Sequence, residues 1–125
     1  MLEGIKVLNF THYLQGPSCA QTLADLGADV VKVESVKGAY ERGWSGCNAY
    51  KNGVSVFFML ANRNERDLSI DLKSPEAKEI IYDLVRNHGY DVIIENFRPG
   101  VMDHLGLGYE TMKEINPAVI YCSCT

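Results

Sequence analysis

The chain has 125 residues and a formal net charge of −4, and its composition is 46% hydrophobic and 22% charged. This length suits one domain, and the composition is that of a globular protein rather than a disordered or fibrous one. The excess of acidic residues argues against a general nucleic-acid binder, which needs a basic face. It leaves room for a local basic pocket that takes one anionic ligand.

Several common classes of protein find no support in the sequence. No apolar run reaches the roughly 18 residues of a membrane span, and the N-terminus lacks the regions of a signal peptide. The four cysteines lack the spacing of a disulfide framework or a zinc site, so we expect reduced thiols, no metal and a cytoplasmic protein. Walker A, dinucleotide-binding and Gly-x-Ser-x-Gly motifs are not found either.

The first 34 residues predict a strand, a helix and a second strand. Residues 5–10 and 29–34 are β-rich runs. Between them a helix is expected from about residue 17 to 26, because proline favours a first helical position and Gly27 would end the helix. This order predicts parallel pairing of the two strands. We expect the helix to bury Cys19, Ala20, Leu23, Ala24 and Leu26.

The middle of the chain, residues 35–61, shows no sustained periodicity. A loop this long inside a compact domain is usually functional or mobile. Within it, residues 54–60 favour a short helix over a strand. Residues 62–66 are a polar connector, and residues 68–72 alternate like a strand.

The clearest predicted helix follows Ser74, which is a good N-cap and precedes Pro75 and Glu76. Proline fits the first helical position, and an acid in the first turn complements the helix dipole. Gly89 would end the helix. One apolar stripe at helical spacing is formed by Ala77, Ile80, Ile81, Leu84 and Val85.

The last third predicts a buried strand at residues 91–95, a loop over 96–108, a short helix over 109–115 and a strand over 118–123. The overall order predicts an α/β domain with a mostly parallel sheet. No helix follows the last strand to cover its face, so we expect the chain to be part of something larger. Packing is the expected role of both cysteines on this strand, Cys122 and Cys124.

Polar side chains gather in the loops that follow the predicted strands, where ligands bind in open α/β sheets. Hydrogen-bond donors outnumber acids there, which favours an anionic, phosphorylated ligand. Simpler roles stay open: Lys73 as a solvated surface charge, Asn96 as the residue of an Asx-turn, and the histidines as hydrogen-bonded loop residues. The loop residues in question are His12, Gln15, Lys37, Lys73, Asn96, Phe97, Arg98 and His104.

The sequence resembles the opening of class III CoA-transferases, the group of the formyl-CoA, carnitine and bile-acid CoA-transferases. The resemblance covers nearly the whole chain in the right order. It rests on residues 4–12, 16–17, 23–34, 62–64, 71–73, 75–76, 95–103, 105–106 and 116–123.

The resemblance implies a Rossmann-like N-terminal CoA-binding domain over residues 1–125, incomplete without the rest of the enzyme. It also implies two full-length subunits interlocked like linked rings, with acyl-CoA and a carboxylic acid as substrates. CoA would be a substrate rather than a permanently bound cofactor. The residues that the resemblance places along CoA are Leu14, Gln15, Ile70, Asp71, Leu72, Lys73, Asn96, Phe97, Arg98 and His104.

Two positions depart from the family pattern. Some members carry Gln where this chain has Leu14, and the oxalate-type enzymes carry Arg where it has His104, so their acyl preference is not carried over.

The family's nucleophile is an aspartate beyond Thr125 that attacks the acyl-CoA thioester, giving a mixed anhydride and then an enzyme–CoA thioester. We therefore expect no catalytic residue in this chain, and no activity from it alone.

Two other functions remain open. The racemase and isomerase branch of the same superfamily shares this domain but abstracts an α-proton from acyl-CoA. Its corresponding loop usually departs from the Asn-Phe-Arg-Pro-Gly sequence of residues 96–100, which favours transfer here. A non-catalytic CoA-binding module is the third possibility.

Overall fold

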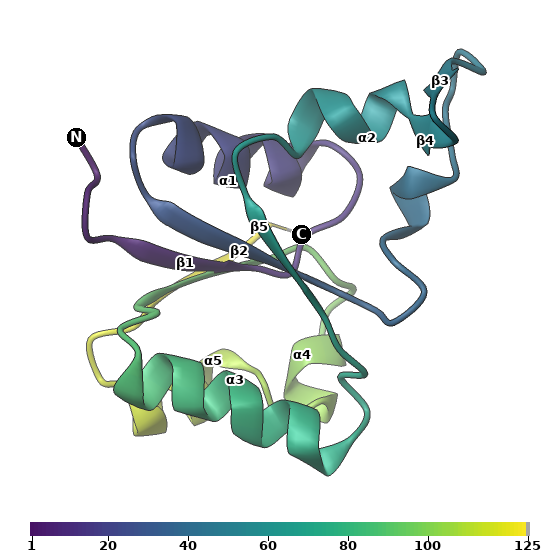
Figure 1. The fold of residues 1–125 in the computed structure, drawn as a ribbon. Coiled ribbons are helices and arrows are strands. Elements are labelled where there is room, and N and C mark those ends of the chain that lie inside the picture. The colour runs from purple at the N-terminus through teal and green to yellow at the C-terminus, as the bar shows by residue number, and fades with distance from the viewer. Residues whose placement is uncertain (125) are drawn as a thin grey trace.

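The computed structural model describes residues 1–124, which form a five-stranded sheet with every strand pair parallel (Figure 1). The strand order is β5-β2-β1-β6-β7. The mostly parallel α/β fold predicted from the sequence is thus confirmed. The strands are β1 (Lys6–Asn9), β2 (Asp29–Glu34), β5 (Arg66–Ser69), β6 (Val92–Glu95) and β7 (Ile120–Ser123).

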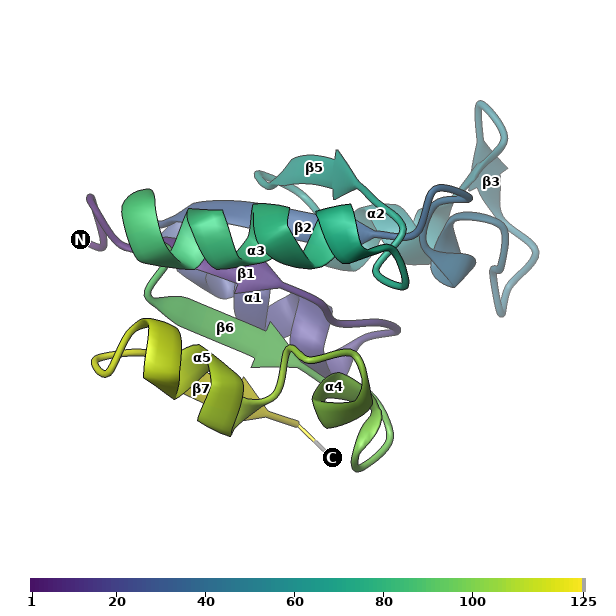
Figure 2. The same cartoon turned by 90° about the horizontal axis from the view of Figure 1, so that it is seen from below.

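Helices cover both faces of this sheet (Figures 1 and 2). On one side lies α1 (Gln15–Asp25), with α2 (Val56–Ala61) beside it; on the other lie α3 (Pro75–Asn87), α4 (Val101–His104) and α5 (Tyr109–Ile115). A 3₁₀ turn, η1 (Tyr40–Arg42), and a small antiparallel hairpin, β3 (Tyr50–Lys51) with β4 (Val54–Ser55), follow β2. Within residues 1–124, no helix has the length and apolar character to cross a bilayer.

Each face of the sheet has its own apolar core. The larger one packs Leu8 and Ile93 of the sheet against Ile81 of α3 and Met112 of α5, all fully buried. The smaller core lies under α1, which contacts β1, β2 and β6. The edge strand β7 is uncovered on the α1 side, where Ile120 is 63% exposed.

Several elements differ in their bounds from the sequence prediction. Strands β1 and β6 are shorter by one or two residues, and β7 begins at Ile120 rather than at residue 118. Helix α1 begins two residues earlier, at Gln15, because a proline fits anywhere in a first turn, whose N–H groups have no helical partner. Strand β5 covers Arg66–Ser69 rather than residues 68–72, because it pairs with β2 from Val31, opposite Arg66, to the end of β2 at Glu34, opposite Ser69. The predicted loop over 96–108 contains the single-turn helix α4.

Burial was predicted wrongly for several apolar residues. Helix α1 turns Ala20 and Ala24 to the sheet, which leaves Cys19 on its flank and Leu26 beyond its end. Helix α3 buries Ala77, Ile81 and Val85, at intervals of four, and half-buries Leu84 against the larger core, whereas Ile80 of the predicted stripe lies in solvent. The residues expected to be buried that are exposed are Cys19, Leu26, Ile80 and Cys122. Cys124 is half-buried against the smaller core.

Other local predictions are confirmed. The Ser74 hydroxyl accepts a hydrogen bond from the N–H of Ala77 at 3.1 Å, as an N-cap does. Gly27 follows α1 with φ +105°, a conformation that favours glycine. The short helix favoured over residues 54–60 is confirmed for residues 56–61, whereas Val54 and Ser55 form strand β4.

Candidate functional site

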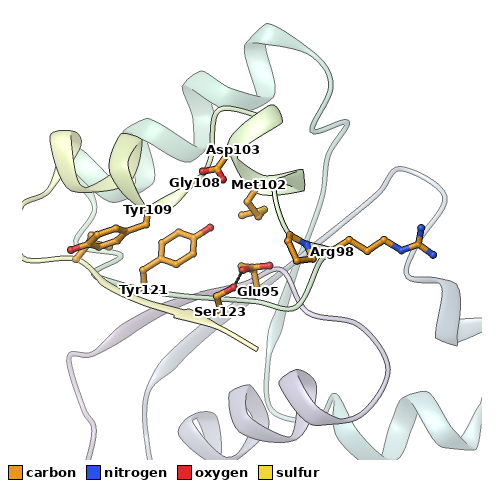
Figure 3. A pocket seen from close by; sticks show the side chains of 11 residues that line it. Glu95, Arg98, Met102, Asp103, Gly108, Tyr109, Tyr121 and Ser123 are labelled. Carbon is orange, nitrogen blue, oxygen red and sulfur yellow. Dashed lines mark hydrogen bonds between the residues drawn. The ribbon is translucent and has the colours of Figure 1, made fainter. Parts of the chain in front are cut away.

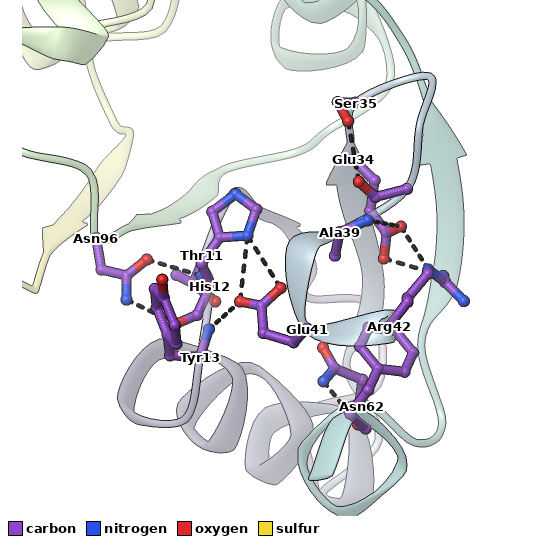
Figure 4. A network of polar contacts seen from close by, with 12 residues as sticks. Thr11, His12, Tyr13, Glu34, Ser35, Ala39, Glu41, Arg42, Asn62 and Asn96 are labelled. Carbon is purple, nitrogen blue, oxygen red and sulfur yellow. Dashed lines mark hydrogen bonds and ion pairs between the residues drawn. The ribbon is translucent and has the colours of Figure 1, made fainter. Parts of the chain in front are cut away.

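The order of strands reverses between β1 and β6, which places the loops after these two strands at a crevice where open α/β sheets bind ligands. Here the two loops are joined by one side chain (Figure 4). The Asn96 Oδ1 accepts from the N–H of His12 at 2.8 Å, and its Nδ2 donates to the His12 carbonyl at 2.9 Å. Asn96 therefore links the β1 and β6 loops rather than closing a local Asx-turn.

A cavity of about 630 Å³, the main cavity, lies beside this crevice. Its walls come from the end of β2, the segment after β5, the loop after β6 and α4. The lining is mostly apolar, and the rings of His12 and Phe97 meet edge to face at 5.5 Å on one wall. Seven residues singled out in the sequence line it: His12, Ile70, Asp71, Leu72, Lys73, Phe97 and His104.

A second hollow of about 490 Å³, the Gln15 hollow, lies at the start of α1. Phe97 and Pro99 line both spaces, so the main cavity and the Gln15 hollow adjoin. The structure thus brings all ten residues that the resemblance places along CoA to two neighbouring hollows. Lys37, another loop residue singled out in the sequence, lines neither of them. The predicted residues that line the Gln15 hollow are Leu14, Gln15, Asn96, Phe97 and Arg98.

A third hollow of about 370 Å³, the Lys78 hollow, extends the main cavity toward α3. It holds the side chains of Lys73, Lys78 and His104, and within residues 1–124 none of the three makes an ion pair or a side-chain hydrogen bond. The two lysine ammonium groups and the ring N–H of His104 suit an anionic group. Lys78 was not among the predicted residues. It lies one helical turn after Ser74, and side chains in a helix tilt toward its N-terminus, so Lys78 reaches back to the start of α3.

A fourth hollow of about 510 Å³ lies on the β7 side of the loop after β6 (Figure 3). Its buried carboxylate, Glu95, accepts hydrogen bonds from the hydroxyl of Ser123 and from the N–H of Phe97. Glu95 therefore serves to hold the loop that carries Phe97. Arg98 is the one predicted residue along this hollow, and its guanidinium extends away from Glu95 in Figure 3.

A buried carboxylate that the sequence did not reveal, Glu41 of η1, lies against the loop after β1 (Figure 4). It accepts a hydrogen bond from the N–H of Tyr13, and both its oxygens lie 3.3 Å from Nδ1 of His12. Burial opposes its ionisation, but the hydrogen bonds from the His12 ring and from backbone N–H groups outweigh burial and lower its pKa to about 2. No periodic pattern surrounds Glu41 in the sequence, so nothing marked it as special.

Polar side chains also support the end of β1 from inside the protein. The buried Lys32 ammonium donates to the Thr11 carbonyl at 2.8 Å, and Asn9 donates to Glu65 at 2.9 Å. Burial lowers the pKa of Lys32, against the opposing effect of nearby carboxylates, chiefly that of Glu65. Burial likewise raises the pKa of the Glu65 carboxyl. In the part of the chain that the structure describes, no three His, Cys, Asp or Glu side chains are grouped to hold a metal.

The sequence of this chain is similar to those of known CoA-transferases. Residues 2–125 match the model of CoA-transferase family III. The chain is 43% identical over 122 residues to a formyl-CoA:oxalate CoA-transferase of Streptomyces coelicolor, covering 98% of this chain and 29% of that protein. It is 42% identical over 127 residues to an acyl-CoA transferase of Fusarium pseudograminearum, covering 96% of this chain and 27% of that protein.

A solved structure agrees with these matches. The crystal structure of a CAIB/BAIF family protein from Brucella suis superposes with a TM-score of 0.88 at 43% identity, covering 98% of this chain and 32% of that one. The chain therefore spans less than a third of the length of these relatives.

Proposed function

This chain belongs to CoA-transferase family III, and we propose that it forms the CoA-binding part of an enzyme that moves CoA from an acyl-CoA donor to a carboxylic acid. One observation carries the proposal beyond the family match. Ten residues from four separate segments line two adjoining hollows at the strand-order reversal, and unpaired cations lie at one end. Residues 1–125 would then be the N-terminal CoA-binding domain.

The chemistry of the hollows suits the parts of CoA. The apolar wall of the main cavity, with Phe97 and Ile70, offers a surface for adenine or the pantetheine arm. Lys73 and Lys78 offer positive charge to phosphates, and the ring of His104 offers a hydrogen-bond donor. His104 stands where the oxalate-type enzymes have Arg, so a contact that is permanently charged in those enzymes would here be titratable.

The covalent chemistry belongs to residues outside this chain in our proposal. A carboxylate would attack the thioester carbonyl, form a mixed anhydride and release CoA as thiolate, which then attacks the enzyme acyl carbon. That step frees the donor acid and leaves an enzyme–CoA thioester. The acceptor carboxylate would then attack this thioester, releasing CoA thiolate and forming a second anhydride. Attack of the thiolate on the acceptor's carbonyl carbon would give the new acyl-CoA and free the enzyme carboxylate. This chain's part is to bind and orient CoA. We further propose a cytoplasmic enzyme whose two full-length subunits interlock.

Calorimetric titration of CoA into the native protein that carries this sequence tests the binding proposal. We expect Lys73→Ala to weaken CoA binding about tenfold, because one phosphate loses a charged partner. Lys51→Ala, in the exposed hairpin, is the matched control and should bind as the wild type does. Equal affinity of the Lys73 variant and the wild type would return Lys73 to the role of a solvated surface charge.

The reaction type is decided by a second experiment on the same protein. Incubation with acyl-CoA and a labelled carboxylic acid should produce labelled acyl-CoA, and hydroxylamine should displace CoA from the enzyme–CoA thioester and leave a hydroxamate on the enzyme. Exchange of the α-proton of acyl-CoA with deuterated solvent, without label transfer, would instead identify a racemase or isomerase. CoA binding with neither reaction would indicate a non-catalytic CoA-binding module.

A further inference from the structure

The backbone between β1 and α1 adopts a conformation that its sequence does not favour. Tyr13 has φ +67°, in the left-handed region that non-glycine residues rarely occupy. Among residues 1–124, the other non-glycine residues with positive φ are Asn48, Asn52 and Asn64, and asparagine tolerates this region best. A tyrosine in this conformation persists only where its surroundings hold it.

Two side chains hold this loop, one from each side (Figure 4). Asn96 pairs with both backbone polar groups of His12. On the other side, Glu41 accepts from the N–H of Tyr13 and lies against the His12 ring. The Glu41 side chain is almost fully buried, at 2% exposure, so water cannot easily take its place.

Glu41 is itself firmly anchored, because a second carboxylate fixes the turn that carries it. Glu34, at the end of β2, accepts from the N–H of Ala39 at 2.7 Å and from two nitrogens of Arg42 at 2.7 and 2.9 Å. These bonds flank Glu41 on both sides in the sequence. The position of the β1 loop is thus linked, through η1, to the end of β2.

The loop that Glu41 contacts carries residues of both hollows. His12 lines the main cavity, while Tyr13, Leu14 and Gln15 line the Gln15 hollow. A change in the backbone at Tyr13 would therefore alter the two spaces together. We propose that Glu41 is a positioning residue, which holds the loop at residues 12–13 in the strained conformation that shapes both hollows for CoA. This inference rests on the proposed function.

A rescue experiment on the native protein separates this role from a general loss of stability. We expect Glu41→Ala to weaken CoA binding about tenfold and Glu41→Gln less, since glutamine still accepts from the N–H of Tyr13. Tyr13→Asn, which favours the left-handed conformation, should restore much of the affinity lost in Glu41→Ala. Glu114→Gln, an exposed glutamate of α5, is the control for the change of charge.

Calorimetry gives the affinities, and hydrogen exchange of the Tyr13 amide reports on the loop without ligand. Exchange should speed up in Glu41→Ala and not in Glu114→Gln. Affinity of Glu41→Ala within twofold of the wild type, or no recovery on adding Tyr13→Asn, would overturn the inference while the proposed function stands. A wild-type protein that fails to bind CoA would refute the proposed function. Unchanged hydrogen exchange of the Tyr13 amide in Glu41→Ala would refute only the role of Glu41.

Discussion

Asn96 offers a sharp test of how the two loops at the strand-order reversal are held together. Its amide makes two hydrogen bonds, both to backbone groups of His12, which lies 84 residues away. Asn96→Ala removes both bonds and leaves the N–H and carbonyl of His12 without these partners. At about 0.5–1.5 kcal/mol for each bond, we expect a loss of roughly 1–3 kcal/mol in the free energy of unfolding.

Urea unfolding followed by circular dichroism measures this loss by linear extrapolation. Asn87→Ala is the matched control, because the Asn87 amide is exposed and donates one bond, to Asp83 at 2.7 Å. It should cost less than about 0.5 kcal/mol. Asn96→Asp should cost more than Asn96→Ala at neutral pH, because a carboxylate would then face the His12 carbonyl.

The reasoning would be refuted by an Asn96→Ala variant as stable as the control, since the link between the loops would then contribute nothing. It would also be refuted by an Asn96→Asp variant that matches the wild type at neutral pH. In that case the donor bond to the His12 carbonyl would have no energetic role.

Three further predictions concern the core, the pH dependence and the sheet edge. Ile81→Ala, at a fully buried position, should lower the free energy of unfolding in urea by about 2–5 kcal/mol. Ile80→Ala, at a position that is 46% exposed, should lower it by less than about 1 kcal/mol. Similar losses in the two variants would contradict the assignment of Ile81 to the core. Folding lowers the pKa of Glu41 from 4.5 to about 2, so the wild type should lose roughly 3 kcal/mol in the free energy of unfolding as the pH falls from 4.5 toward 2. Glu41→Gln should lack this part of the loss. Equal dependence of stability on pH in the two proteins would contradict the prediction. The isolated 125-residue chain should self-associate through its edge strand β7, and Ile120→Lys should reduce this in light scattering, whereas a monomeric wild-type chain with a cooperative melt would be evidence against it.

Much of the fold follows from local signals that need no tertiary information. Ser74, Pro75 and Gly89 mark the ends of α3 through capping, fixed φ and a left-handed turn, all of which act over a few residues. The buried strand β6 is readable because parallel strands are apolar on both faces. Helix α4 was missed because a single turn is too short to show a helical period.

The candidate site likewise contains residues that the sequence indicated and residues that only the structure revealed. The sequence by itself determined the parallel α/β class, the family and the residues expected near a ligand, because short motifs and strand ends carry that information. Only the tertiary structure decided that Glu41 and Lys78 join them, since each reaches the site through contacts between segments far apart in the chain. It also decided that the Asn96 amide is committed to His12, because a side chain's partner depends on which loops the sheet order brings together.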